Sequence, residues 1–165
     1  MATQAKPIPA GYHSVTPVLT VRDVDKPIDF YKRALGAEER LRFIGPDRKS
    51  VMHAELKIGD SVIMLGGEQA DKGCRSPQTL GGTPVSLYLY VEDADKAFSR
   101  ATSAGATVAM PVADMFWGDR CGTFVDPFGH TWSVAARKED LSQEEIQKRG
   151  EAFFAEMAKR QPSCV

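Results

Sequence analysis

The chain has few cysteines, no long hydrophobic run and almost no net charge. Its three cysteines, Cys74, Cys121 and Cys164, are far apart and form no CxxC pair, which argues against a zinc ribbon or a disulfide framework. We therefore expect reduced thiols and a cytoplasmic protein. No apolar stretch reaches the length of a transmembrane helix, and the polar N-terminus does not have the pattern of a signal peptide, so we expect no membrane partner.

Charge of neither sign predominates. The 21 Lys and Arg residues nearly balance the 22 Asp and Glu residues, for a net charge of -1. Because a nucleic-acid-binding domain needs a basic surface, we expect no nucleic-acid partner. The length of 165 residues and the apolar fraction of 42% are those of one compact domain of ordinary size.

Within that domain, the order strand, helix and three strands occurs twice. The expected elements of the first copy are strands at 15–21, 38–43, 51–58 and 61–65, with a helix that Gly36 ends. Those of the second copy are strands at 85–91, 107–112, 123–125 and 132–134, with a helix that Asp93 caps. The two copies are also similar in sequence, since Leu19, Val21 and Asp23 recur as Leu89, Val91 and Asp93.

This duplication predicts an α+β fold in which neither copy can bury its sheet alone. We expect two βαβββ modules to form one curved eight-stranded mixed sheet around a cleft, with helices on its outer face and an added C-terminal helix. The expected boundaries are an arm at 1–11, modules at 12–65 and 83–137, a linker at 66–82 and a helical extension at 138–165.

The extension begins with a capping box, Ser142 to Glu145, and is expected to be helical to about Arg160. It has an apolar stripe of Ile146, Phe153, Phe154 and Met157. An isolated helix of this length is marginal in water, so we expect it to pack on its own domain or on a partner subunit.

The motifs of the chain resemble those of a known family. Leu-x-Val-x-Asp before a helix with Phe30-Tyr31, and Asp126-Pro127-x-Gly129 before the last strand, are similar to the vicinal oxygen chelate superfamily. That superfamily includes glyoxalase I, extradiol dioxygenases, fosfomycin-resistance enzymes and bleomycin-binding proteins. The segments Gly-Gly-Thr-Pro-Val-Ser, Phe-Trp-Gly-Asp-Arg and Asp-Pro-Phe-Gly-His-x-Trp resemble its PhnB-like, glyoxalase/bleomycin-resistance branch. The resemblance covers residues 13–137 and implies the paired-module fold, but one fold hosts many reactions.

The resemblance also implies up to four metal-ligand positions, one on the first and one on the last strand of each module. They fall at Thr16, Met64, Ser86 and Ser133. Metal enzymes of the family carry His, Gln or Glu there, whereas hydroxyls and a thioether do not form a firm divalent site. We therefore expect no metal and no cofactor, with a divalent metal at a shifted site as the alternative.

Other side chains are candidates for the chemistry of a site. His53 and Glu55 are two residues apart on one strand and share a face, so they could act as a general base and its partner. The alternative is a solvated or packed pair on a half-exposed strand. Trp117 and Arg120 lie in a loop of the second module and offer a ligand π surface and a cation, or else they serve only the packing of the core.

Strand alternation adds further lining to the expected cleft. Tyr88 and Tyr90 share the strand face of Ser86, and Met64 and Thr16 face the same interior. A cleft of this composition suits a small, largely apolar or aromatic molecule. The sequence therefore favours a glyoxalase/bleomycin-resistance-like binding protein without the usual metal site, and the family habit of dimerisation implies a homodimer.

The alternative function is an enzyme of the same fold, of the lyase, isomerase or dioxygenase type. It would use His53 and Glu55 as acid and base, or a shifted divalent metal site.

Overall fold

The computed structural model describes residues 6–160, so that Cys164 and the first five residues of the arm lie outside the described part. The first module comprises β1 (Val18–Val21), α1 (Asp25–Leu35), β2 (Glu38–Ile44), β3 (Val51–Ile58) and β4 (Ser61–Gly67). The linker contains a 3-10 helix, η1 (Ala70–Lys72), and a short helix, α2 (Pro77–Leu80). The second module comprises β5 (Ser86–Tyr90), α3 (Ala94–Ser103), β6 (Thr107–Asp114), β7 (Asp119–Val125) and β8 (Thr131–Arg137), and α4 (Gln143–Arg160) follows.

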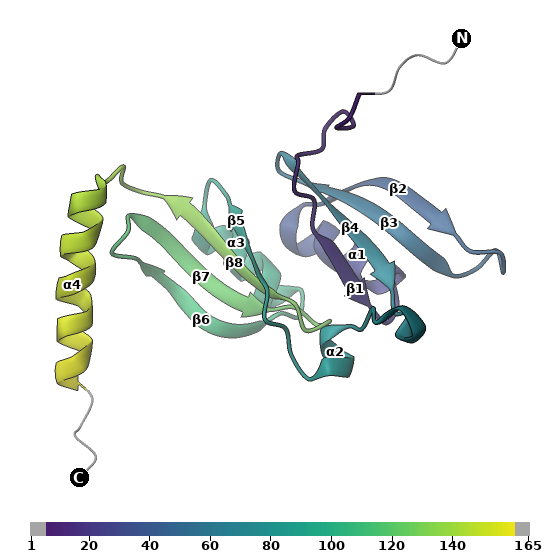
Figure 1. Cartoon of the computed structure of the whole chain (residues 1–165). Helices are drawn as coiled ribbons and strands as arrows, with labels where there is room; N and C mark the ends of the chain where they lie inside the picture. The colour runs from purple at the N-terminus through teal and green to yellow at the C-terminus, as the bar shows by residue number, and fades with distance from the viewer. Residues whose placement is uncertain (1–5, 161–165) are drawn as a thin grey trace.

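The α+β fold of two βαβββ modules with a C-terminal helix is confirmed. The eight strands, however, form two four-stranded sheets, ordered β1-β4-β3-β2 and β5-β8-β7-β6, and not the single sheet expected from the sequence. In each sheet the first strand of the module pairs in parallel with the last, Val18 beside Met64 and Tyr88 beside Ser133. Figure 1 shows the two sheets side by side.

Helix packing explains why the two sheets belong to one domain without being hydrogen-bonded to each other. α1 and α3 contact one another, and Arg100 of α3 donates its Nε to the carbonyl of Ala34 in α1 at 3.0 Å. One hydrophobic core extends over both modules and includes Ile28 of α1, Ala101 of α3 and Val134 of β8. The modules therefore bury their helix-covered faces together, and the opposite face of each sheet is left uncovered by α1 and α3.

Local signals in the sequence set the helix boundaries. Gly36 ends α1 with φ 68°, a conformation that a glycine adopts without the strain a side chain would add. The carboxylate of Asp93 accepts from the backbone N–H of Lys96 at 2.9 Å and caps α3. Ser142 accepts from the N–H of Glu145 at 3.2 Å, which confirms this bond of the expected capping box.

The turn between β7 and β8 ties the two modules together through Asp126, which is 4% exposed. Its Oδ1 accepts from the backbone N–H groups of Phe128 and His130, both at 2.9 Å. Its Oδ2 accepts from the Tyr31 hydroxyl at 2.6 Å and from Trp132 Nε1 at 3.0 Å. Because Tyr31 belongs to α1, this one carboxylate bonds the last hairpin of the second module to the helix of the first.

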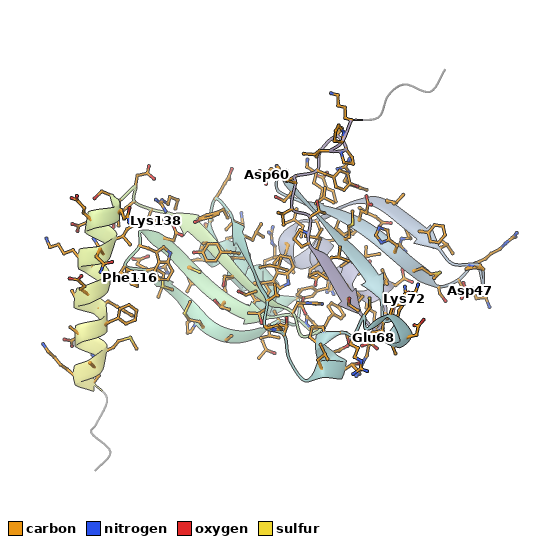
Figure 2. All side chains as sticks on the ribbon, viewed as in Figure 1. Asp47, Asp60, Glu68, Lys72, Phe116 and Lys138 are labelled. Atoms are coloured by element: carbon orange, nitrogen blue, oxygen red, sulfur yellow. The ribbon has the colours of Figure 1, made fainter. Side chains whose placement is uncertain are left out.

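The C-terminal helix α4 lies at the edge of the second module, beside β6 and β7 (Figure 1). Its main anchor is Phe116, whose ring centroid is 5.5 Å from that of Phe153 and 5.9 Å from that of Phe154. Figure 2 shows Phe116 between the second sheet and this helix. The helix therefore packs on its own domain, although Phe153 and Phe154 keep 47% and 61% of their surface exposed. Within residues 6–160, no helix is long and apolar enough to cross a membrane.

Candidate functional site

Each sheet has one face turned away from α1 and α3, which we term the open face. Side chains alternate along a strand, so the buried positions identify which residues lie on it. In the second sheet, Leu87, Leu89, Trp132 and Val134 pack toward the helices. The open face of that sheet accordingly carries Tyr88, Tyr90, Asp119, Thr123 and Ser133. The open face of the first sheet carries Val18, Leu41, Phe43, His53, Glu55 and Met64.

Polar groups of the second open face converge on Asp119, which is 2% exposed. Tyr88 and Tyr90 donate their hydroxyls to its Oδ2 at 3.0 and 3.1 Å, and Trp117 donates Nε1 to the same oxygen at 3.2 Å. Arg137 Nη1 lies 3.4 Å from Oδ1. A buried carboxylate is costly unless it is paired and hydrogen-bonded, and these four partners supply both requirements.

The two tyrosines present their rings at the surface of this cluster. Their exposed fractions are 45% for Tyr88 and 59% for Tyr90, and the ring centroids are 5.3 Å apart in an edge-to-face arrangement. Burial raises the pKa of both Tyr88 and Tyr90, and the hydrogen bond of each hydroxyl to Asp119 raises it further. Both hydroxyls therefore keep their hydrogen at neutral pH, and the rings form a fixed aromatic surface.

The first open face holds a second polar cluster around Glu55. Tyr12, which precedes β1, donates its hydroxyl to Oε2, and His53 Nε2 lies 3.4 Å from Oε1. Thr16 and Met64 border a hollow of about 330 Å³ together with Tyr12 and Glu55. The structure thus brings together the four site residues that the sequence predicted in this module.

Arg120 is a predicted ligand-binding residue that the structure does not bring to the open face. Its guanidinium bonds Asp95 of α3 at 2.6 and 2.7 Å and Asp114 of β6 at 3.0 Å. Arg120 follows Asp119 on β7, so strand alternation turns its side chain to the opposite face. Trp117 lies with the tyrosines, whereas Arg120 joins β7 to the start of α3.

Comparison with known proteins identifies the family. Residues 12–134 match the family described as the Glyoxalase/Bleomycin resistance protein/Dioxygenase superfamily. The chain belongs to this superfamily. An uncharacterized protein of Mycobacterium tuberculosis is 43% identical over 138 residues, which cover 81% of this chain and 80% of that protein.

Solved structures show the same relationship. The crystal structure of TioX from Micromonospora sp. ML1 is 29% identical, with a TM-score of 0.60, and the match covers 75% of this chain and 99% of TioX. A mutant of the fosfomycin resistance protein FosX from Listeria monocytogenes is 20% identical with a TM-score of 0.58, and the match covers 82% of this chain and 94% of that chain. At that identity the likeness to FosX shows the shared fold alone.

The resemblance to metal enzymes of the superfamily implies that their metal-ligand positions correspond here to Thr16, Met64, Ser86 and Ser133. The hydroxyl of Thr16 donates to the carbonyl of His13 at 3.2 Å, and the oxygens of Ser133 and Thr123 are 2.8 Å apart. Neutral hydroxyls and a thioether are a poor donor set for a divalent cation, so these four residues do not fit such a metal. Among residues 6–160, no three His, Cys, Asp or Glu side chains lie close enough together to hold an ion.

Three site residues were missed by reasoning from the sequence. Asp119 and Arg137 lie outside the strands expected at 123–125 and 132–134, because β7 and β8 are longer than expected. Along these longer strands, alternation places both residues on the face of Thr123 and Ser133. Tyr12 offered no such signal, because it precedes β1 and lies in no helix or strand. Only its hydrogen bond across the chain to Glu55 places it at the site.

Proposed function

We propose that the chain binds a small, largely apolar or aromatic molecule on the open face of the second sheet. The observation that carries this proposal is the pair of exposed tyrosine rings whose hydroxyls bond the buried Asp119. Rings already held in one orientation give contact area with little further loss of conformational entropy on binding. Trp117, held by the same oxygen, adds a third aromatic group to the surface.

A thermal-shift screen of aromatic compounds, run with and without divalent metals, tests this function. Compounds that stabilise the protein are then titrated while tryptophan fluorescence is recorded. Because Trp132 is only 2% exposed, a change in fluorescence reports mainly on Trp117. We expect Tyr88→Ala and Tyr90→Ala each to weaken binding about tenfold, equivalent to about 1.4 kcal/mol. Ser99→Ala, on the exposed surface of α3, serves as the control and leaves the affinity unchanged. Unchanged affinity in both tyrosine variants would refute the assignment.

A second candidate function is catalysis at the first open face. It is favoured by the contact of His53 Nε2 with Glu55 Oε1 at 3.4 Å, beside a hollow that a substrate could enter. The carboxylate would orient the imidazole, which would take a proton from the substrate. Any turnover found in a substrate screen should be lost in His53→Gln but kept in Ser99→Ala, a change on the exposed surface of α3 that is remote from the hollow. Equal loss or equal retention in the two variants contradicts the role of His53.

We also propose that the protein is a cytoplasmic homodimer of the PhnB-like branch. The reduced thiols of Cys74 and Cys121 suit a reducing compartment. The open faces leave large apolar side chains exposed, which a second copy would cover: Val18, Leu41, Phe43 and Met110. Light scattering after size exclusion should give a molar mass twice the chain mass of 18.1 kDa. In Phe43→Glu the measured mass should fall to that of a single chain. A monomer at all concentrations would exclude the dimer.

A further inference from the structure

On the second open face, the polar hydrogens of Tyr88, Tyr90 and Trp117 are all donated to Asp119. A carboxylate has only acceptor oxygens, so each group that bonds it must donate. Tyr88 and Tyr90 each have a single hydroxyl hydrogen, and both are donated to Oδ2. Trp117 has one N–H, and it is donated to the same oxygen. What the two tyrosines can still offer a ligand is therefore the lone pairs of their oxygens and the faces of their rings.

Neighbouring groups keep the hydroxyls of Tyr88 and Tyr90 in this donating orientation. Arg137 Nη1 lies 3.4 Å from the other oxygen of Asp119, and Arg137 Nε bonds Asp140 at 3.2 Å. The hydroxyls of the tyrosines cannot turn toward a ligand without leaving a buried carboxylate short of donors, which is costly. Their raised pKa values mean that each oxygen keeps its hydrogen and does not become a phenolate.

From this geometry we propose that Asp119 fixes Tyr88 and Tyr90 as hydrogen-bond acceptors, so that the site selects flat aromatic ligands with an N–H or O–H group on the ring. The inference rests on the proposed binding function and names its ligand class. An N–H placed between the two oxygens gains a bond, and the ring stacks on the exposed tyrosine faces. A ligand with an ether or carbonyl oxygen at the same place would face the lone pairs of the tyrosine oxygens. Its own oxygen would then have no hydrogen-bond donor. Asp119 is thus a positioning residue that acts through the tyrosines.

Two probes of nearly equal shape test the inference: indole, which has a ring N–H, and benzofuran, which has an oxygen at that position. Dissociation constants are measured for the full chain by ligand-observed NMR. We expect indole to bind about fivefold more tightly than benzofuran, the ratio that one net hydrogen bond gives. In the double variant Tyr88→Phe/Tyr90→Phe this ratio should fall to about one, because the rings remain while the acceptors are gone. Ser99→Ala should keep the ratio of the wild type.

Asp119→Asn provides a second variant that leaves both tyrosines in place. Its amide can donate to a tyrosine oxygen, which frees that hydroxyl to donate to a ligand, so the preference for indole should shrink or reverse. Circular dichroism and a melting curve confirm that the variant is folded before it is titrated.

The possible outcomes separate this inference from the proposed function. Equal binding of indole and benzofuran to the wild type would overturn the inference while aromatic binding stands. A preference for indole that persists in the double variant would mean that groups other than the two tyrosines accept the hydrogen bond from its N–H. That result would also overturn the inference. Failure of both probes to bind would overturn the proposed function and the inference together.

Discussion

Removal of the Tyr31 hydroxyl tests whether Asp126 holds the two modules together. Tyr31 is fully buried, and its hydroxyl donates to Asp126 Oδ2 at 2.6 Å. The substitution Tyr31→Phe keeps the ring and its contacts but removes one hydrogen bond to a buried charged group. Such bonds contribute about 1.5–3 kcal/mol each. Asp126 keeps three other donors, so we expect the free energy of unfolding to fall by about 2 kcal/mol and the fold to persist.

Tyr12→Phe is a matched control for this measurement. The chemical change is the same, and Tyr12 also donates to a carboxylate, that of Glu55. Tyr12, however, is partly exposed, so water can replace the lost bond and we expect a cost below about 0.5 kcal/mol. Urea unfolding followed by circular dichroism gives both values, and an unchanged m-value shows that only stability has changed. If Tyr31→Phe costs no more than Tyr12→Phe, Asp126 does not join the modules in the way the geometry indicates.

Three further predictions concern stability. Burial raises the pKa of Tyr31 well above its ordinary 10.0, so the unfolded chain loses this proton at a lower pH than the folded chain does. The free energy of unfolding should therefore fall as pH rises above about 10. Urea titrations at alkaline pH should show a shallower fall in Tyr31→Phe. Burial lowers the pKa of His130, whose Nε2 lies 3.2 Å from the carbonyl of Thr20, so the unfolded chain takes up a proton first as pH falls below about 6.5. Stability should therefore drop on acidification, and less so in His130→Gln, as chemical denaturation at several pH values would show. Gly122→Ala would place a Cβ 2.8 Å from the Phe98 ring, and we expect a loss of about 1–3 kcal/mol and a lower melting temperature.

Features set by neighbouring residues could be predicted from the sequence. Gly36 ends α1, Asp93 caps α3 and Ser142 caps α4, because each signal acts on backbone groups within five residues of itself. The faces of the strands followed from their period of two, which placed His53 with Glu55 and Tyr88 with Tyr90.

Contacts between distant segments could not be predicted in the same way. Whether β1 and β5 would bond into one sheet depends on how α1 and α3 pack, and no local pattern records the angle of that packing. The sequence also did not show that Tyr12 would cross to Glu55, or that Asp126 would find Tyr31 on another element.

The sequence by itself determined the family, the two modules and the residue types at the superfamily's metal-ligand positions. Those properties lie in short motifs and in the alternation of apolar and polar residues. The tertiary structure decided which polar groups meet on the open face, where Asp119 takes the hydrogens of two tyrosines and a tryptophan while its neighbour Arg120 bonds α3. The physical reason is that a hydrogen bond between strands depends on register and packing, which only the folded chain sets.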